Sequence, residues 1–438
     1  MQVPKLRDGP RGVVALRVVV FALLVVTTVS AAHSIVTYDP APDTDIDGEW
    51  DGTLVAVIDG TGPGQIVAYD SEGDVRYRNT SFWLYHDVDP SPVGESTVTY
   101  VASRPTGSDA CPGPGDGCLV NAIERVNLTT GEVERLYTDV DSRNGSTQTH
   151  DVDRVNESVF LVADISFPDR VYMVNVTSDE VIWEWRVSEA YEPESGGEYP
   201  SDWTHLNDVE YLPDGRVMAN LRNQDSVVFI EPGEGIQEDW TLGEDDELRT
   251  LYEPHNPDYI PASRGGPAVV IADSENNRLV EYQREDGEWV RTWRWRDSTL
   301  QWPRDADRLP NGNTLVADSH GSRILSVAPD GEIAWSRPFP DGGYDVELLE
   351  TGPESAGGES AARLGLESGS PEGGTASLRY AVVSVVPPLV MHGLLYALPD
   401  WASTTDAFLV ICTALAVVCL LLAEATIRFR PRLRDRLN

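Results

Sequence analysis

The chain is 438 residues long and carries 72 acidic against 33 basic residues, a formal charge of −39. Such a surface repels polyanions, so general nucleic-acid or anionic-membrane binding is excluded. Its 41% apolar content, with 12 Trp, is ample for a packed core. The only lysine is Lys5. An acid-rich, lysine-poor surface suits concentrated salt, where screening weakens the repulsion between like charges. This predicts a protein of a halophile with an acidic proteome.

The first 32 residues have the pattern of an exported protein. A basic start is followed by an uncharged run from Val18 to Ala32, and Val29-Ser30-Ala31 is a candidate cleavage site. Residues 1–32 are therefore either a signal peptide or a signal anchor. In both cases the basic flank stays inside and the next domain is exported.

The C-terminal part contains two more apolar runs. Residues 381–399 are a possible membrane segment, and residues 407–427 predict a transmembrane helix before the basic tail 428–438. If both runs crossed, the tail and the main domain would share one side, which conflicts with export and an inside tail. Residues 351–377, rich in Gly, Ser and Glu, predict a flexible acidic linker.

Sequons and cysteines also favour an extracytoplasmic domain at the cell membrane. Five N-x-[ST] sequons predict a glycoprotein; they begin at Asn79, Asn127, Asn144, Asn156 and Asn175. Cys111 and Cys118 bracket a short Pro/Gly loop, which predicts a disulfide. No histidine lies nearby to complete a metal site, and we expect no metal or other cofactor.

Between the apolar ends a polar signature recurs every 40 to 65 residues or so, the period of propeller blades. Its copies are His86–Asp89, His150–Asp153, Asn207–Glu210, His255–Asp258, Arg304–Asp307 and Asp345–Glu347. Turns such as Pro213-Asp214-Gly215 and Pro310-Asn311-Gly312 then lead into alternating strands. Six strand groups and six inner strands predict an all-β fold, a six-bladed β-propeller over residues 50–350, closed by pairing of its N- and C-terminal strands. The late-strand tryptophans are expected between blades: Trp183, Trp240, Trp293 and Trp335.

Five of the seven histidines fall in the propeller, four of them at or just before an inner strand: His86, His150, His205, His255 and His320. Inner strands line the central channel, so these side chains should converge at one mouth. The alternative is that the His-Asp pairs only hydrogen-bond neighbouring blades. Arginines in or after the same strands would attract a small oxyanion, unless they pair with surface carboxylates: Arg222, Arg278, Arg304 and Arg323.

Residues 202–207 (D-W-T-H-L-N) and 221–224 (L-R-N-Q) resemble the D-W-x-H-x-N … S-R-N-Q signature of the PAPS-independent arylsulfotransferase family. That resemblance implies a six-bladed propeller that transfers a sulfuryl group from an aryl sulfate donor to a phenolic acceptor through a sulfated histidine, without a nucleotide cofactor. By position His205 and His255 match family histidines, and His320 is the candidate nucleophile. Arg278 or Arg222, with Arg323, would bind the anion.

Two other classes remain open at this stage. A membrane-anchored propeller without activity would be a binding or interaction module, since the fold alone fixes no function. A quinone- or metal-dependent oxidoreductase or lactonase would need a carboxylate-rich ring in the channel, which the repeated Asp positions offer, and bound Ca²⁺ would identify it.

Overall fold

The computed structural model describes residues 11–37, 50–59, 63–90, 92, 95–107, 111, 118–142, 148–296, 300–339, 342–369, 398 and 404–437. The chain divides into two compact units. One is residues 41–371, and the other combines residues 1–40 with residues 372–438.

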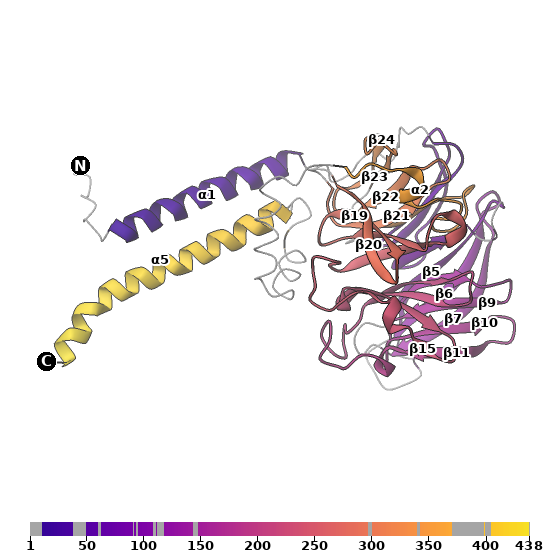
Figure 1. The fold of residues 1–438 in the computed structure, drawn as a ribbon, viewed down its shortest axis with the longest axis horizontal. Coiled ribbons are helices and arrows are strands. Elements are labelled where there is room, and N and C mark those ends of the chain that lie inside the picture. Colours follow the sequence, from indigo (N-terminus) through magenta and orange to yellow (C-terminus); the bar gives the residue numbers. More distant parts are fainter. Residues whose placement is uncertain are drawn as a thin grey trace. The chain divides into compact units, whose positions relative to one another are not determined.

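The larger unit is the predicted propeller, with six antiparallel sheets as blades (Figure 1). Blade 1 contains β4 (Leu84–Asp89), β5 (Thr97–Thr106), β6 (Cys118–Asn127) and β7 (Val133–Ser142). Blade 2 contains β8 (Thr149–Arg154), β9 (Val159–Asp164), β10 (Arg170–Asn175) and β11 (Glu180–Arg186). Blade 3 contains β12 (Leu206–Tyr211), β13 (Val217–Leu221), β14 (Ser226–Glu231) and two short strands that pair with β14, β15 (Gly235–Ile236) and β16 (Leu242–Gly243).

The remaining blades follow the same pattern. Blade 4 contains β17 (Pro254–Ile260), β18 (Ala268–Asp273), β19 (Arg278–Glu285) and β20 (Glu288–Trp295). Blade 5 contains β21 (Pro303–Arg308), β22 (Thr314–Asp318), β23 (Arg323–Val327) and β24 (Ile333–Pro338). Blade 6 joins the two ends of the unit: β25 (Gly343–Leu348), β1 (Leu54–Ile58), β2 (Gln65–Tyr69) and β3 (Val75–Asn79).

The predicted closure is confirmed in blade 6. β1 pairs antiparallel with β25, placing Leu54 opposite Leu348 and Val57 opposite Asp345. All eleven residues of these two strands are buried. The first and last strands therefore each supply the pairing edge that the other lacks.

The core lies between blades, where alternate strand residues from two neighbouring sheets interdigitate. One cluster joins Leu161 and Val171 of blade 2 to Val209 and Val228 of blade 3. The four tryptophans predicted between blades pack against such clusters: Trp183, Trp240, Trp293 and Trp335. Tight turns connect the strands, and Gly215 and Gly312 have φ of +93° and +88°, which the P-D-G and P-N-G turns require.

Part of the predicted flexible linker is ordered. Helix α2 (Ala361–Leu364) has Ser360 as its N-cap, and the Ala361 N–H donates to Glu281. The Ser355 hydroxyl accepts from the Arg308 N–H, and both side chains are about 1% exposed. These residues pack on the propeller because their polar groups have buried partners there. The part of the expected flexible linker that lies between residues 351 and 369 is therefore ordered.

The smaller unit contains two long helices, α1 (Arg11–Thr37) and α5 (Thr404–Leu437). Gly12–Ala32 and Phe408–Ile427 are long and apolar enough to cross a membrane. Polar contacts join them in antiparallel fashion: Arg17 pairs with Glu424 at 2.6 Å, and Ser30 and Ser34 donate to Asp406. The possible membrane segment predicted over residues 381–399 lies outside the described residues.

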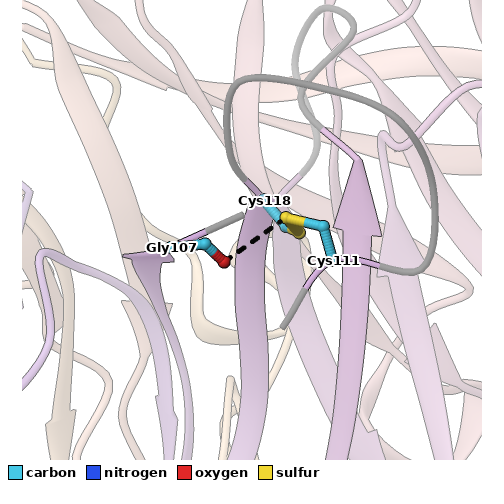
Figure 2. The surroundings of a disulfide bond; sticks show 3 residues. All are labelled: Gly107, Cys111 and Cys118. Atoms are coloured by element: carbon cyan, nitrogen blue, oxygen red, sulfur yellow. Dashed lines mark hydrogen bonds between the residues drawn. A yellow bond between two sulfur atoms is a disulfide. The ribbon is translucent and has the colours of Figure 1, made fainter. Parts of the chain in front are cut away.

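The predicted disulfide joins Cys111 and Cys118 where β6 begins (Figure 2). Of the five sequons, the one at Asn144 lies outside the described residues. In each of the other four, the Asn side chain accepts a hydrogen bond from the N–H two residues later, at Asn79, Asn127, Asn156 and Asn175. Glycosylation of these turns stays a prediction.

Candidate active site

The N-terminal ends of the inner strands bring side chains from all six blades together. In five copies of the repeat, the residue before the first acid lies near the start of its inner strand: His86, His150, Asn207, Arg304 and Tyr344. Blade 4 adds His255, the second residue of β17. The sequence expectation that histidines distant in the chain converge at one end of the channel agrees with this arrangement.

Four histidine rings form a contact network around Tyr344. His86 stacks on His150 with ring centroids 4.2 Å apart, and His150 lies 4.9 Å from His205. Tyr344 lies 5.2 Å from His86 and 5.9 Å from His255. The four histidines come from blades 1, 2, 3 and 4, so the propeller geometry, and no local motif, creates the cluster.

The hydrogen bonds of His205 and His255 set their tautomers. His205 Nδ1 lies 2.7 Å from Asp202 Oδ1, a carboxylate oxygen that only accepts, so Nδ1 carries the proton. His255 Nδ1 contacts the Glu253 carbonyl at 3.2 Å and Ser274 Oγ at 2.8 Å, while Ser274 donates its own proton to Pro303 O. His255 Nδ1 is therefore also the donor. In both residues the Nε2 lone pair is left for chemistry.

Two arginines lie beside these histidines. Arg222 follows β13 and forms a two-bond ion pair with Glu253, at 3.0 and 2.5 Å. Arg304 lies over Trp302 and Tyr344, with its guanidinium carbon 4.4 and 4.7 Å from the ring centroids. Among the described residues, Arg304 Nε and Nη1 have no hydrogen-bond partner. Arg304 Nη1 lies 3.9 Å from Asp59 Oδ2, so Arg304 has an ion-pair partner but keeps N–H groups without a hydrogen bond, whereas Nε and Nη2 of Arg222 are engaged by Glu253.

The electrostatics favour the neutral form of His205 and His255. Burial lowers the pKa of His255 well below its ordinary value, and Arg222 and Arg304 lower it further. Burial and Arg222 likewise lower the pKa of His205, although Asp202 opposes them. A neutral imidazole is the nucleophilic form, so the arginines that would attract an oxyanion also hold His255 ready to attack it.

The backbone is strained at the same place. Non-glycine residues with positive φ include His205 at +46°, Glu253 at +45°, Asn256 at +37° and Trp302 at +52°. Such conformations persist where the surrounding structure holds them, and they concentrate at functional sites.

The acids of the repeat have a separate role, deeper in the channel. Asp151 accepts a hydrogen bond from the Val209 N–H of the next blade at 2.6 Å, and Asp345 accepts from Val88 in the same way at 2.7 Å. These carboxylates bridge adjacent blades, as the alternative reading of the His-Asp pairs expected. Hydrogen bonding between neighbouring blades is thus the role of the aspartates, whereas the histidine rings contact one another.

The other residues chosen from the sequence lie farther from this network. His320 is exposed, and its ring stacks on Trp302 at 4.3 Å, which places it at the edge of the cluster next to His255. Arg278 pairs with Asp273 at 2.5 Å, and Arg323 pairs with Asp318 at 2.7 Å. These two arginines are held by carboxylates of their own blades, each joining the second strand to the third.

Comparison with protein families identifies the part of the chain that carries this site. Residues 118–255 match the family model described as Arylsulfotransferase (ASST). The resemblance of the sequence to the arylsulfotransferases is thus confirmed over this stretch. The ASST match includes His150, His205, Arg222 and His255, while His86, Arg304, His320 and Tyr344 lie outside it.

No curated protein matches the chain. Among solved structures, a Bacteroides caccae protein of unknown function is 12% identical, covers 70% of this chain and 97% of its own, and has a TM-score of 0.45. The periplasmic gluconolactonase PpgL of Pseudomonas aeruginosa is 13% identical, with coverages of 68% and 98% and a TM-score of 0.44. A putative 6-phosphogluconolactonase of Bacteroides fragilis is 13% identical, covers 71% of this chain and 99% of its own, and has a TM-score of 0.43. These similarities say nothing about activity.

The sequence analysis named Arg304 among the arginines that could attract an oxyanion but did not choose it to bind the substrate, although a signal for this was present. Arg304-Asp305-Ala306-Asp307 occupies in blade 5 the place of His86-Asp87-Val88-Asp89 in blade 1. The same alignment identifies Tyr344 before Asp345. Asp59 had no sequence signal: it follows β1 and lies 3.3 Å from His86 Nε2 only because the two ends of the unit pair.

Proposed function

We propose that this protein is an arylsulfotransferase-like enzyme, which transfers a sulfuryl group between phenols through a sulfated histidine. The observation that carries the proposal is the convergence of His150, His205, Arg222 and His255, all within the stretch that matches the ASST family model, with Arg304 of blade 5 beside them. Guanidinium groups suit a sulfate ester because they present paired donors to its oxygens.

His255 is our choice of nucleophile. Both arginines lie close enough to lower its pKa, so an anion bound between them would lie near His255. Its Nδ1–H is fixed by Ser274 and Glu253, which leaves Nε2 for attack. His320, the candidate from sequence position, is the alternative to test.

The reaction then has two displacements. In the first, the His255 Nε2 lone pair attacks the sulfur, the S–O bond to the donor breaks, and the phenolate leaves with the bonding pair. In the second, His205 accepts the proton of the acceptor phenol, whose oxygen attacks the sulfur while the S–N bond breaks and its electron pair returns to His255. Arg304 and Arg222 offset the charge on the sulfuryl oxygens in both steps.

The test is turnover by the full chain, purified in high salt. With p-nitrophenyl sulfate as donor, we expect release of p-nitrophenol that depends on an added phenol. Denaturation during turnover without acceptor should give one added SO₃ group on the peptide containing His255. If His255→Ala retains turnover and His320→Ala loses it, the nucleophile is His320. If the folded wild-type chain turns over none of several aryl sulfates, the enzyme proposal is wrong and the binding module replaces it.

Membrane tethering is the second part of the proposal. If α1 and α5 both span, their antiparallel pairing leaves the two basic ends of the chain on one side, as the positive-inside rule favours. The propeller then lies on the extracytoplasmic side, where the Cys111–Cys118 disulfide is stable. Protease added to intact cells should digest the propeller. Protection of the propeller until the cells are lysed would contradict this topology.

A further inference from the structure

At the end of the channel opposite the histidines, five carboxylates surround one turn. Asp89, Glu347 and Glu354 form one group and Asp258, Asp307 and Glu354 another, and in each group one oxygen per residue lies within 4.8 Å of the others. We propose that this cluster, called here the acidic end, is a Ca²⁺ site. Because the histidines lie at the opposite end of the inner strands, this ion would be structural and would not by itself identify a metal-dependent oxidoreductase or lactonase; the site is independent of the sulfuryl-transfer proposal.

Unpartnered oxygens give the second, independent reason. Glu347 Oε2 is buried and has no hydrogen-bond partner among the described residues. Asp258 Oδ1 and Asp307 Oδ2 are also buried and accept from no N–H or hydroxyl there, and the carboxyls of these two residues lie within hydrogen-bonding reach of each other. Asp258, Asp307 and Glu347 are 0%, 1% and 2% exposed. Leaving a buried ionised oxygen without a partner is costly, and a cation bound in either group would satisfy the oxygens of that group.

The other oxygens of these side chains are used to hold them in place. Asp258 Oδ2 accepts from the Ser355 hydroxyl, and Glu347 Oε1 accepts from the Glu354 N–H at 2.6 Å. Asp258 and Glu347 therefore each have one oxygen fixed by the protein and one left for a cation. This is how a preorganised cation ligand is built.

The protein supplies little charge to balance the acidic end. Arg308, the nearest buried arginine, is bound to Glu281 at 3.2 Å and Thr314 at 2.6 Å. Arg264 donates to the Ser355 and Gly358 carbonyls and lies near Asp258.

Ca²⁺ fits this set better than other common ions. All the donors are carboxylate oxygens, which hard cations prefer, and the absence of His or Cys among them argues against zinc or copper. Ca²⁺ accepts six to eight oxygen ligands in flexible geometry, whereas Mg²⁺ requires a near-octahedral shell and usually keeps several waters, so a cluster of protein carboxylates suits Ca²⁺ better. The ligands come from blades 1, 4, 5 and 6 and the turn after β25, so the ion would join blades across the channel.

The experiment compares the full chain in concentrated KCl with EDTA, Mg²⁺ or Ca²⁺, by metal analysis and thermal unfolding. Glu347→Gln keeps an acceptor for the Glu354 N–H while replacing the unpartnered oxygen, and Glu354→Gln removes the shared ligand. Glu359→Gln, an exposed residue paired with Arg363, is the control.

We expect retained Ca²⁺ in the wild type and a melting temperature that Ca²⁺ raises more than Mg²⁺ does. Each of the two variants should bind Ca²⁺ more weakly than the wild type. Loss of an outer-shell partner weakens metal binding by about 10- to 100-fold, and loss of a direct ligand should weaken it at least as much. In EDTA the same variants should melt above the wild type, because one repelling charge is gone. The control should behave like the wild type in every buffer. Absence of bound Ca²⁺ with no Ca²⁺-dependent stabilisation, or a wild-type response of Glu347→Gln, would overturn the site.

Discussion

Replacing Arg304 is the sharpest test of how the site binds a sulfate ester. Arg304→Ala removes the guanidinium Nε and Nη1 groups, which have no hydrogen-bond partner in the described part of the chain, although Nη1 lies 3.9 Å from Asp59 Oδ2. A hydrogen bond to a charged group contributes about 1.5–3 kcal/mol, so two contribute roughly 3–6 kcal/mol. At 1.4 kcal/mol per factor of ten, kcat/KM should fall by about 10²–10⁴.

The assay is acceptor-dependent release of p-nitrophenol under subsaturating donor. Arg304→Lys keeps the charge but loses the planar donor pair, so it should recover only part of the lost activity. Arg186→Gln, which alters an exposed pair with Glu184, should leave kcat/KM unchanged. A fall of less than about threefold in Arg304→Ala would refute Arg304 as the anion clamp, since one charged hydrogen bond alone contributes more.

Three further changes probe the supports of the site. Ser274→Ala removes the 2.8 Å partner of His255 Nδ1, and misplacement of the ring should lower kcat by up to about 100-fold while the melting temperature changes little. An unchanged kcat would show that the Glu253 carbonyl suffices. Burial raises the pKa of Asp151 from 3.8 to about 7, so its protonated form stabilises the fold fully below 3.8 and this stabilisation is lost as pH rises through about 7. In Asp151→Asn the thermal-unfolding midpoint should therefore fall less steeply as pH rises. A pH dependence equal to that of the wild type would contradict this role of Asp151. Replacing Cys111 and Cys118 by Ser should lower the free energy of unfolding by about 2–3 kcal/mol in urea titrations.

The fold was predictable because its signals are local and repeated. Alternating strands and the polar signature of the inner strand recur in each blade, and a late tryptophan recurs in blades 2 to 5, so the blade count follows from the sequence. Closure followed from counting, since the first strand group lacked an inner strand and the segment containing Val346 lacked partners. Ordering of residues 351–369 was not predictable, because Gly-rich composition does not reveal that Ser355 and the Ala361 N–H have buried partners on the propeller.

The site was predictable only in part. His205 lies in a family motif, and His255 begins an inner strand, so both were found. The arginines were harder, because their roles depend on which carboxylates reach them across the folded structure. Asp273 engages Arg278 within its own blade, whereas Arg304 has unpartnered donors and lies on aromatic rings. Nothing in the local sequence distinguishes these two environments.

Closure of the ring by β1 and β25 has a consequence for biosynthesis. Tyr344 lies on β25 and Asp59 directly follows β1, so the histidine cluster is bounded by the earliest and the latest parts of the propeller to be synthesised. Until residues 343–348 have been synthesised, β1 has an open edge and the cluster lacks its central tyrosine. A nascent or truncated chain is therefore without a complete site, and the capacity for chemistry arises only when the whole domain has closed.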